Sequence, residues 1–261
     1  MNLLEVEELG IDFGGVKAVD GLSFAVPRGL IFSIIGPNGA GKTTLFNMIS
    51  GVYRPSRGRI RLAGQDVAAR PPHLLAADGL SRTFQNLQIF FRMTALENVM
   101  VGRHLHERGP LLPQLFALPS VRRRHREPQA RARELLDFVG LASAADLPAA
   151  SLSYGALKRL EIARALATEP KLLLLDEPAA GCNAVETEEI DRLIQVVAEN
   201  GVTVMLVEHD MRLVMKISHR ILVLDYGKKL AEGTAAEVRA NPDVIRAYLG
   251  TESGEVRHGD A

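Results

Sequence analysis

The sequence predicts an α/β protein, in which a parallel β-sheet is covered by helices, preceded by an antiparallel β-rich segment and interrupted by a helical insertion. Residues 1–85 contain mostly short apolar or alternating runs separated by Gly- and Pro-containing turns, a pattern typical of strands. Strand signals vanish between residues 94 and 150, where two helical segments flank a stretch rich in Pro and Arg. From residue 153 onward, helical and strand patterns alternate, which indicates parallel strands joined by helices.

The individual elements are expected in the same order. The N-terminal strands are predicted at residues 3–9, 22–26, 30–35 and 59–62. A helix at 43–50 follows the third of these strands, and the insertion contributes helices at 95–101 and 129–139. In the last part of the chain, helices are predicted at 155–168, 186–200 and 210–217, and strands at 171–175, 202–207 and 221–224. A chain of this length can form one large domain or two closely packed ones.

Composition excludes several classes of protein. The 261 residues contain 31 Lys and Arg and 31 Asp and Glu, so the formal net charge is zero and the broad basic surface of a nucleic-acid-binding protein is not expected. The lone cysteine, Cys182, excludes an internal disulfide framework and fits a reducing compartment. No secretory signal is expected at the N-terminus, and the longest uncharged run, 109–121, is too short to span a membrane.

A glycine-rich segment carries the strongest functional signal. Residues 36–44 fit the pattern G-x-x-x-x-G-K-[ST] of a phosphate-binding loop, between the predicted strand 30–35 and the predicted helix 43–50. Glycines let successive backbone N–H groups converge on phosphate oxygens, and the helix N-terminus adds positive potential. We therefore expect a bound nucleoside triphosphate, with Lys42 reaching its β- and γ-phosphates and the Thr43 hydroxyl binding Mg²⁺. The loop residues are Gly36, Pro37, Asn38, Gly39, Ala40, Gly41, Lys42, Thr43 and Thr44.

Two carboxylates follow a second strongly apolar strand. Residues 172–175 are all leucine, and Asp176 and Glu177 come directly after them. Because neighbouring side chains on an extended chain point apart, one carboxylate can face a metal ion while the next faces the attacking water. We therefore expect Asp176 to bind Mg²⁺ and Glu177 to polarise the water that attacks the γ-phosphate. Such a pair alone is also typical of an acidic turn, and its combination with the phosphate loop favours an active site.

A third segment lies just upstream of these carboxylates. Leu152-Ser153-Tyr154-Gly155-Ala156 and the helical residues after it resemble the signature segment of ATP-binding-cassette (ABC) ATPases. Gln85, His209 and Phe13 stand where that family has a coupling glutamine, a switch histidine and an adenine-stacking aromatic. The resemblance spans nearly the whole chain and implies ATP as the nucleotide, catalytic roles for Gln85 and His209, and Gln85 as a further Mg²⁺ ligand. It also implies that Phe13 stacks on the base, although a core or turn aromatic is the competing interpretation.

The same resemblance implies the fold and its division. The expected fold is a P-loop NTPase of the ABC cassette type, with a RecA-like parallel-sheet core, an N-terminal antiparallel β subdomain and an inserted α-helical subdomain. Residues 1–261 would form a single ABC ATPase domain. Within it, residues 1–90 and 168–240 would form the nucleotide-binding core with the β subdomain, 91–167 the helical subdomain with the signature, and 241–261 a C-terminal helix and tail.

In this family, two cassettes dimerise head to tail and enclose ATP between them. Carried over to this chain, the Ser153 hydroxyl and the Gly155 N–H would contact the γ-phosphate held by Lys42 of the partner subunit, and the 180–183 segment would cross the interface. By itself, a Leu-Ser-x-Gly segment is more often an ordinary helix cap. The chain departs from the family at Ala156, where Gln is usual, and at Ala184, where Pro is frequent. Both departures leave the turnover rate and the tightness of the interface open.

Several segments resemble one subfamily, the larger of the two cassettes in bacterial branched-chain amino acid importers. These segments are 13–19, 81–86, 152–155, 177–181, the insertion 104–129 and the ending 242–250. The resemblance implies a second cassette, identical or homologous, two integral membrane permeases and, indirectly, a substrate-binding protein. The chain would be peripheral, on the cytoplasmic face of the inner membrane, and would dock on a permease loop through the region around Gln85 and the helical segment. The transported molecule would not contact it.

Other assignments stay open. Urea or short-chain amide importers use very similar cassettes, and the lipopolysaccharide-export cassette shares Leu-Ser-Tyr-Gly, although the long insertion argues against it. A soluble ABC ATPase of DNA repair or translation would generally carry two cassettes or a long coiled-coil insert, and the chain has neither. The insertion, with its apolar stretch 111–118 and basic run 122–126, lies either near the permease and lipid headgroups or in a solvated loop.

Overall fold

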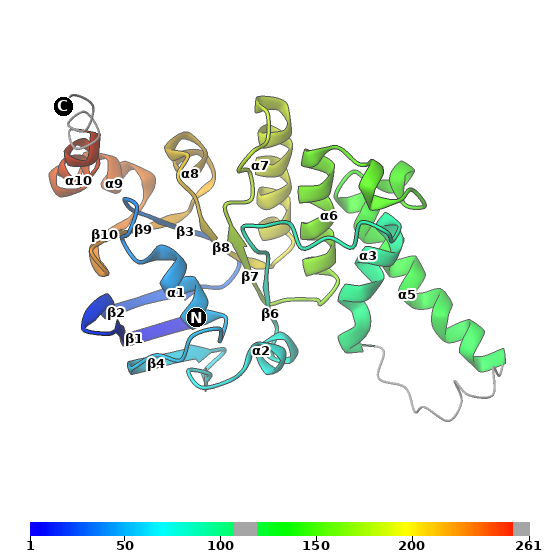
Figure 1. The fold of residues 1–261 in the computed structure, drawn as a ribbon, viewed down its shortest axis with the longest axis horizontal. Helices are drawn as coiled ribbons and strands as arrows, with labels where there is room; N and C mark the ends of the chain where they lie inside the picture. Colours follow the sequence, from blue (N-terminus) through cyan, green and yellow to red (C-terminus); the bar gives the residue numbers. More distant parts are fainter. Residues whose placement is uncertain (107–118, 253–261) are drawn as a thin grey trace.

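The chain folds into two β-sheets with helices around them, as the computed structural model shows for residues 1–106 and 119–252 (Figure 1). One sheet has six strands and is largely parallel, and the other has four antiparallel strands from the N-terminal quarter of the chain. Helices from the 91–167 region extend the molecule at one end of the six-stranded sheet (Figure 1). The predicted α/β fold class, with its parallel core, antiparallel sheet and helical insertion, is confirmed.

The six-stranded sheet forms the centre of the molecule. In spatial order its strands are β10 (Lys228–Gly233), β9 (Arg220–Asp225), β3 (Ile31–Ile35), β8 (Thr203–Val207), β7 (Leu172–Asp176) and β6 (Leu80–Arg82). Five of the strands are parallel, and β10 pairs antiparallel with β9. The four strands predicted for this sheet lie within two residues of their expected bounds. The edge strands β6 and β10 were not predicted, because neither contains an apolar run that a strand pattern could detect.

The four-stranded sheet consists of β2 (Val16–Pro27), β1 (Asn2–Phe13), β4 (Arg57–Leu62) and β5 (Gln65–Asp66), in that order. Strands β1 and β2 form one long hairpin rather than the two short strands expected. Its register shifts between Val6 and Leu9, and Glu8 there has a positive φ of 46°. This irregularity interrupts the alternation on which the prediction depended. At the tip, Gly14 and Gly15 both have positive φ, as tight hairpin turns require.

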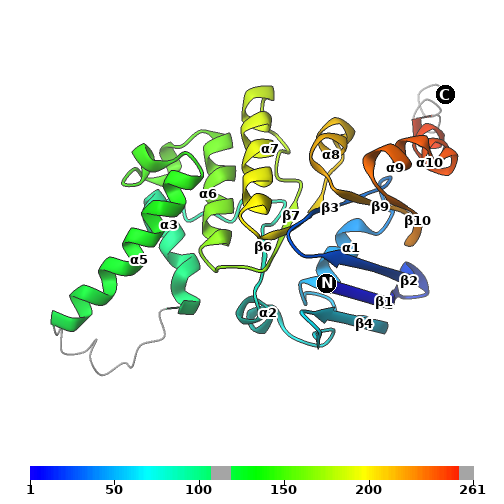
Figure 2. The same ribbon diagram turned by 180° about the vertical axis from the view of Figure 1, so that it is seen from behind.

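Helices cover both faces of the six-stranded sheet. Helix α1 (Lys42–Ile49) lies between the two sheets, as the opposite views in Figures 1 and 2 show. The other face carries α6 (Tyr154–Leu166), α7 (Ala184–Glu199), α8 (Met211–Ile217), α9 (Ala235–Ala240) and α10 (Pro242–Glu252). Helices α3 (Ala95–Gly102) and α5 (Pro119–Phe138) pack on α6 beyond the β6 edge (Figure 1). Short 3-10 helices occur at Arg103–His106, Ala142–Ala144 and Ala149–Ser151.

Alternate residues of the central strands point into different cores. On β7, Leu172 and Leu174 pack with α1 and the four-stranded sheet, whereas Leu173 and Leu175 pack with α3, α5, α6 and α7. All four leucines are 0% exposed, so this strand is buried on both faces, as parallel strands in α/β proteins are. A third cluster, which includes Val223 on β9, joins the sheet to α8, α9 and α10.

Two helices differ from the expected pattern. Helix α2 (Pro72–Asp78) was not predicted, since seven residues between Pro71 and the left-handed Gly79 are too few to show a helical period. Helix α5 begins at Pro119 rather than at 129 and contains Pro128 in its interior. Proline in a helix interior removes a backbone hydrogen bond and crowds the preceding turn, so the predicted helix began only after Pro128, whereas the structure continues the helix through it. The apolar stretch 111–118 of the insertion lies outside the described residues.

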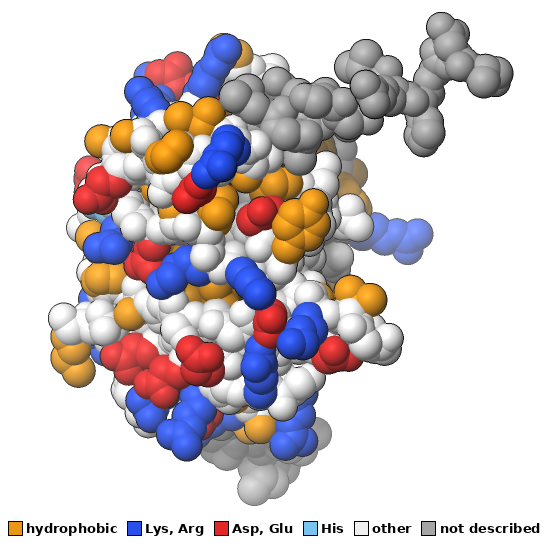
Figure 3. Space-filling view, turned by 90° about the vertical axis from the view of Figure 1, so that its left-hand side faces the viewer, with side chains coloured by type: hydrophobic (Ala, Val, Ile, Leu, Met, Phe, Trp, Pro, Cys, Tyr) orange, Lys and Arg blue, Asp and Glu red, His pale blue; other side chains and the backbone are white. Residues whose placement is uncertain are grey.

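Charges of both signs are mixed at one end of the molecule (Figure 3). Figure 3 views the end of the molecule that lies at the left in Figure 1, and Lys and Arg side chains there are interspersed with Asp and Glu. This pattern agrees with the zero net charge of the chain and offers no broad basic surface on that face. Within the described residues, no helix is long and apolar enough to cross a bilayer.

We predict that Leu174→Ala lowers the free energy of unfolding by about 2–5 kcal/mol, because the 0% exposed side chain leaves a cavity between β7 and α1. Urea denaturation followed by circular dichroism measures this change. Leu147→Ala is the matched control, since the Leu147 side chain is 49% exposed and should cost little. A loss below about 1 kcal/mol for Leu174→Ala would contradict the two-sided burial of β7.

Candidate nucleotide-binding site

The predicted site residues follow strands that lie side by side. In the sheet order, β3, β8 and β7 are neighbours and run parallel. Val207 on β8 is in register with Ile34 on β3 and with Asp176 on β7. The carboxyl ends of the three strands therefore reach the same edge of the sheet. This edge gathers the phosphate loop after β3, Glu177 after β7 and His209 after β8.

The phosphate loop connects β3 to α1 and needs glycine at its two ends. Gly36 has φ 152°, and a Cβ placed there would lie 2.2 Å from the Leu224 carbonyl oxygen. Gly41 has φ 96°, and a Cβ there would lie 2.5 Å from the Ala18 carbonyl oxygen. Both contacts are with backbone, which cannot move aside as a flexible side chain could. The loop is thus clamped between β9 and β2, with its N–H groups at the start of α1.

Lys42 is the first residue of α1 and folds back over the loop. Its Nζ donates hydrogen bonds to the carbonyl oxygens of Gly36, at 2.6 Å, and of Pro37, at 2.9 Å. Burial lowers the pKa of Lys42, and the nearby Glu177 carboxylate opposes that change. The ammonium group therefore already lies at the loop, near the Glu177 carboxylate that follows β7. The neighbouring Thr43 is exposed and open to a ligand.

Asp176 is buried in an ion pair that the sequence did not predict. Its Oδ2 accepts a hydrogen bond from Arg82 Nη2 at 2.9 Å, and both side chains are less than a tenth exposed. Arg82 Nη1 also donates to Asn47 Oδ1 at 2.7 Å and to Ser50 Oγ at 2.8 Å, which ties β6 and β7 to α1. The role of Arg82 was not predicted, because its position three residues before Gln85 does not indicate a partner. The tertiary structure alone brings it to Asp176.

Glu177 lies outside strand β7 and has a left-handed backbone, with φ 49°. The expectation that Asp176 and Glu177 alternate along one extended strand is therefore wrong, because β7 ends at Asp176. The Glu177 N–H donates to the Val207 carbonyl oxygen at 3.0 Å, which fixes the turn. A non-glycine residue in this conformation is strained, and such strain is concentrated at functional sites. The turn places the Glu177 carboxylate among the other predicted catalytic groups.

Two predicted catalytic side chains flank that carboxylate. Gln85 Nε2 lies 3.5 Å from Glu177 Oε2, and His209 Nδ1 lies 3.8 Å from Glu177 Oε1. The His209 side chain is 67% exposed, so it is free to meet a ligand. The structure thus brings Gln85, Glu177 and His209 together beside the phosphate loop, although they come from three separate parts of the chain.

Glu208 is a buried carboxylate behind this group that the sequence did not identify. Its residue is 2% exposed, and its oxygens accept hydrogen bonds from the N–H groups of Ala179, at 3.3 Å, and His209, at 3.1 Å. Burial raises the pKa of Glu208, and these hydrogen bonds oppose the rise. Glu208 Oε2 also lies 3.8 Å from His209 Nδ1. Glu208 therefore positions the His209 backbone and the turn after Glu177. Its place between the buried strand β8 and His209 was the one sequence signal that could have identified it.

The signature residues do not join this site within one chain. Ser153 caps α6, where its side chain accepts a hydrogen bond from the Ala156 N–H. Among residues 1–106 and 119–252, no hydrogen bond or ion pair links Ser153 or Gly155 to the phosphate loop, and Figure 1 shows α6 and α1 well apart. The Gly155 N–H instead donates to Glu186 Oε1 at 3.1 Å.

Phe13 ends β1 and is 46% exposed. Its ring meets Tyr53 edge to face, with centroids 5.5 Å apart. An exposed aromatic face next to a second ring can accept a stacked base, and it is not part of the buried cores described above. The base-stacking role remains a prediction.

A hollow of about 420 Å³ lies beside Gln85, between the segment after β6 and helices α3 and α6. Exposed apolar side chains gather on this segment and on α3, namely Phe84, Phe90, Phe91, Met93 and Val101. Inside the hollow, Glu161 and Arg164 on α6 hold the N–H and the carbonyl oxygen of Gln88. Clusters of exposed apolar residues of this kind mark interaction sites.

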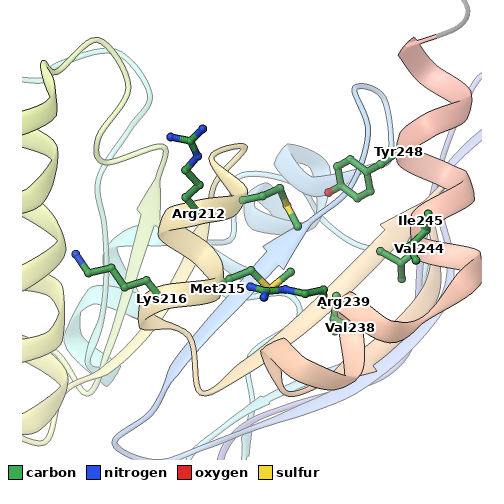
Figure 4. A pocket seen from close by; sticks show the side chains of 9 residues that line it. Arg212, Met215, Lys216, Val238, Arg239, Val244, Ile245 and Tyr248 are labelled. Carbon is green, nitrogen blue, oxygen red and sulfur yellow. The ribbon is translucent and has the colours of Figure 1, made fainter.

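A second hollow, of about 620 Å³, lies among α8, α9 and α10 at the opposite end of the sheet (Figure 4). Figure 4 shows Arg212 and Lys216 pointing away from it, so these two cations do not converge on a ligand. Burial raises the pKa of Tyr248 on its wall to about 12, and a hydrogen bond with the Gly36 backbone opposes the rise. Helix α10 is thereby connected to the phosphate loop.

The side chains at the sheet edge fit a metal ion that arrives with a nucleotide. The described residues contain no group of three or more His, Cys, Asp or Glu that could hold a metal ion by themselves. Mg²⁺ typically keeps several waters and is bound by one or two carboxylates together with substrate phosphates. Asp176, the Thr43 hydroxyl and the Gln85 amide supply oxygen atoms of the required kind at this edge.

Comparison with known proteins identifies the class that this fold and site define. The family described as "ABC transporter" matches residues 19–180, and the family described as "Branched-chain amino acid ATP-binding cassette transporter" matches residues 228–253. The chain belongs to the ABC transporter family, as one of its ATP-binding cassettes. The resemblance found in the sequence is confirmed.

Individual relatives cover almost the whole chain. The high-affinity branched-chain amino acid transport ATP-binding protein BraF of Pseudomonas aeruginosa is 48% identical over 249 residues, which are 95% of this chain and 98% of that protein. A nucleotide-free ATP-binding cassette of an ABC transporter has a similar structure, with a TM-score of 0.83, 33% identity, and coverage of 95% of this chain and 99% of that one. A cassette solved as a post-hydrolysis dimer with ADP and Pi has a TM-score of 0.74, 26% identity, and coverage of 89% and 98%.

We predict that Arg82→Ala lowers the free energy of unfolding by about 3–5 kcal/mol, because Asp176 is left buried without its partner. Equilibrium urea denaturation of the nucleotide-free protein measures the change. Adding Asp176→Asn to Arg82→Ala should recover part of the loss, since the unpaired charge is removed. Arg61→Ala is the control, because its pair with Glu7 is far more exposed than the Arg82 pair and should contribute less than about 1 kcal/mol. Equal losses for Arg82 and Arg61 would contradict the prediction.

Proposed function

We propose that this chain is the ATP-hydrolysing subunit of a bacterial importer for branched-chain amino acids. The observation that carries the hydrolytic role is the convergence of Lys42, Gln85, Glu177 and His209 at one edge of the parallel sheet. The cargo assignment is supported by the similarity to BraF and by the family match of residues 228–253. The chain itself would not touch the cargo and would instead convert ATP binding into movement of a membrane partner.

In this proposal, the phosphate loop binds the triphosphate of ATP. The N–H groups of 36–44 surround the phosphates, and Lys42 turns from the loop carbonyls to the β- and γ-phosphates. The exchange keeps the ammonium group paired throughout, because phosphate oxygens replace carbonyl oxygens. Phe13 offers an exposed ring to the adenine.

Mg²⁺ would be held by the Thr43 hydroxyl, Asp176 and Gln85, all at the carboxyl edge of the sheet. When bound, it neutralises phosphate charge. Asp176 is paired with Arg82, so the Arg82 guanidinium holds this carboxylate in place. The buried pair therefore holds an acidic ligand in a position where a lone carboxylate would be costly.

Hydrolysis would depend on Glu177, Gln85 and His209. The Glu177 carboxylate accepts a hydrogen bond from the attacking water, and the left-handed turn keeps it aimed at the loop instead of along β7. Gln85 adjoins one oxygen of that carboxylate and His209 the other. The exposed imidazole of His209 would donate a hydrogen bond to the γ-phosphate. Catalysis in this scheme consists of positioning and charge stabilisation.

The complete site would need a second cassette, identical or homologous to this chain. In one chain, Ser153 and Gly155 lie on α6, apart from the phosphate loop (Figure 1). The helix N-terminus at Ser153 is suited to an anion, and the γ-phosphate on the partner subunit is the anion expected there. The solved post-hydrolysis dimer of a related cassette supports this arrangement.

The membrane partner would dock at the apolar residues beside Gln85. The hollow there lies between the catalytic glutamine and α6, whose N-terminus carries Ser153. A permease loop seated in it would contact both halves of the proposed ATP site. The chain would then be peripheral, on the cytoplasmic face of the membrane, and attached through two permease subunits that receive cargo from a substrate-binding protein.

We predict that Lys42→Ala weakens nucleotide binding by roughly 10- to 100-fold, because two or more charge-assisted hydrogen bonds to phosphate are lost. Titration with a fluorescent ATP analogue measures the dissociation constant. Lys17→Ala removes an exposed lysine that pairs with Asp20 and should leave binding unchanged. Unchanged affinity in Lys42→Ala would remove Lys42 from the site.

We predict that Glu177→Gln still binds ATP but hydrolyses it about 10²- to 10⁴-fold more slowly, and accumulates ATP-bound dimers. Phosphate release and analytical ultracentrifugation measure the two effects. Glu199→Gln, at the exposed end of α7, is the charge-matched control. Near-normal turnover in Glu177→Gln would exclude Glu177 as the general base.

The same variant tests the transport function in cells. Labelled leucine uptake is compared in cells that lack this chain and carry either the wild type or Glu177→Gln. Uptake restored by the wild type alone is the expected result. If leucine uptake never depends on the chain, the amino acid assignment falls, and labelled urea and short-chain amides become the next cargoes to assay.

A further inference from the structure

The proposed γ-phosphate site on α6 is already occupied by a carboxylate of the same chain. Glu186 Oε1 accepts a hydrogen bond from the Gly155 N–H at 3.1 Å and lies 3.4 Å from Ser153 Oγ. These are the two groups assigned to the γ-phosphate of ATP held by the partner subunit. Glu186 belongs to α7, 31 residues further along the chain than Gly155, so the contact is a tertiary one.

The carboxylate is fixed in this position from both sides. Its second oxygen, Oε2, accepts from the Asn183 N–H at 3.2 Å, and the Asn183 side chain caps α7 in return. A Cβ on Gly155 would lie 2.6 Å from the Glu186 carboxyl carbon, so the absence of a side chain at 155 is what admits the carboxylate. Gly155 is buried in this arrangement, and an incoming phosphate oxygen cannot reach its N–H while Glu186 remains.

A carboxylate and a phosphate cannot share these donors. Both are anions, both seek the N–H groups at the start of α6, and close approach of two like charges is unfavourable. The Gly155 N–H is a single donor, and it can satisfy one acceptor well at a time. Closure of two cassettes on ATP must therefore remove Glu186 from the signature segment.

We propose that Glu186 is a positioning residue that competes with the γ-phosphate: it holds the signature segment in the single chain and leaves when the ATP-bound dimer closes. The inference rests on the proposed function, because it takes Ser153 and Gly155 as the γ-phosphate ligands. This competition raises the ATP concentration needed for dimer closure, since the γ-phosphate has to displace the Glu186 carboxylate before Ser153 and Gly155 can bind it.

The same contact connects the signature segment to the 180–183 segment that is expected to cross the interface. Glu186 binds Gly155 with one oxygen and Asn183 with the other. Close by, the Tyr154 ring packs so tightly on Gly181 that a Cβ there would lie 3.0 Å from it. Release of Glu186 would therefore alter both segments that are expected to face the partner subunit.

The first test measures dimer formation by the full chain in the Glu177→Gln background. Glu186→Gln is added, which keeps the shape and the capping position of the side chain but removes its charge. The ATP concentration for half-maximal dimer, read by analytical ultracentrifugation, should fall roughly tenfold, because a neutral amide is a weaker competitor than a carboxylate. Glu188→Gln is the matched control, since its exposed carboxylate pairs with Arg192 and not with α6.

The second test reports on the signature segment of the monomer. Labelling tyrosine with ¹³C at the carbonyl and glycine with ¹⁵N selects two amides, Gly155 and Gly227, because only Tyr154 and Tyr226 precede a glycine. Inorganic phosphate should shift the Gly155 signal at a roughly tenfold lower concentration in Glu186→Gln than in the wild type. Gly227, whose N–H donates to Ala40 in the phosphate loop, reports binding there separately.

The outcomes separate the two ideas. Competition by Glu186 is supported if Glu186→Gln dimerises at a lower ATP concentration and its Gly155 signal shifts at a lower phosphate concentration, with unchanged thermal unfolding. If neither the ATP concentration for dimer formation nor the phosphate concentration for the Gly155 shift falls in Glu186→Gln, the proposal is overturned. The contact is then only part of the α7 cap. If Glu177→Gln alone forms no ATP-dependent dimer, the proposed function fails, and the Gly155 titration still decides whether Glu186 occupies the anion site.

Discussion

The parallel alignment of β3, β8 and β7 is the constraint on which the rest of the structure depends. Because Val207 is in register with both Ile34 and Asp176, the three strands end at the same level. Two-sided burial prevents any slip, since a shift by one residue would exchange the side chains of two different cores. The phosphate loop, the Glu177 turn and the His209 segment are thereby held close together.

Three of the groups proposed to meet ATP or Mg²⁺ have an internal partner in the single chain. Lys42 binds the loop carbonyls, Asp176 binds Arg82, and the Gly155 N–H binds Glu186. Buried or half-buried polar groups are costly when unpaired, so such partners stabilise the single chain. They also make ligand binding an exchange of partners, in which only the difference between two sets of interactions drives closure.

Agreement between sequence and structure was best where the local signal was physical and strong. The structure contains the predicted conformation at the strand of four leucines, at the apolar strand before the phosphate loop and at the glycines of that loop. Agreement failed at edge strands β6 and β10, at the short helix α2 and in the bulged hairpin, where pairing with a neighbour outweighs a weak local pattern. The prediction of an extended backbone at Glu177 was also wrong, because nothing in an Asp-Glu-Pro sequence indicates a left-handed turn.

The sequence by itself determined the class of fold and the nucleotide chemistry, because the phosphate loop and the Asp176-Glu177 pair lie in contiguous motifs whose form reflects backbone geometry. The roles proposed for Gln85, His209, Phe13, Ser153 and Gly155 came from the resemblance to ABC ATPases. Only the tertiary structure decided which charges oppose one another across strands and helices. Arg82 meets Asp176 from 94 residues away, and Glu186 meets Gly155 from 31 residues away. The physical reason is that a hydrogen bond depends on distance in space, and sheet order and helix packing, which set that distance, are not encoded in any local pattern.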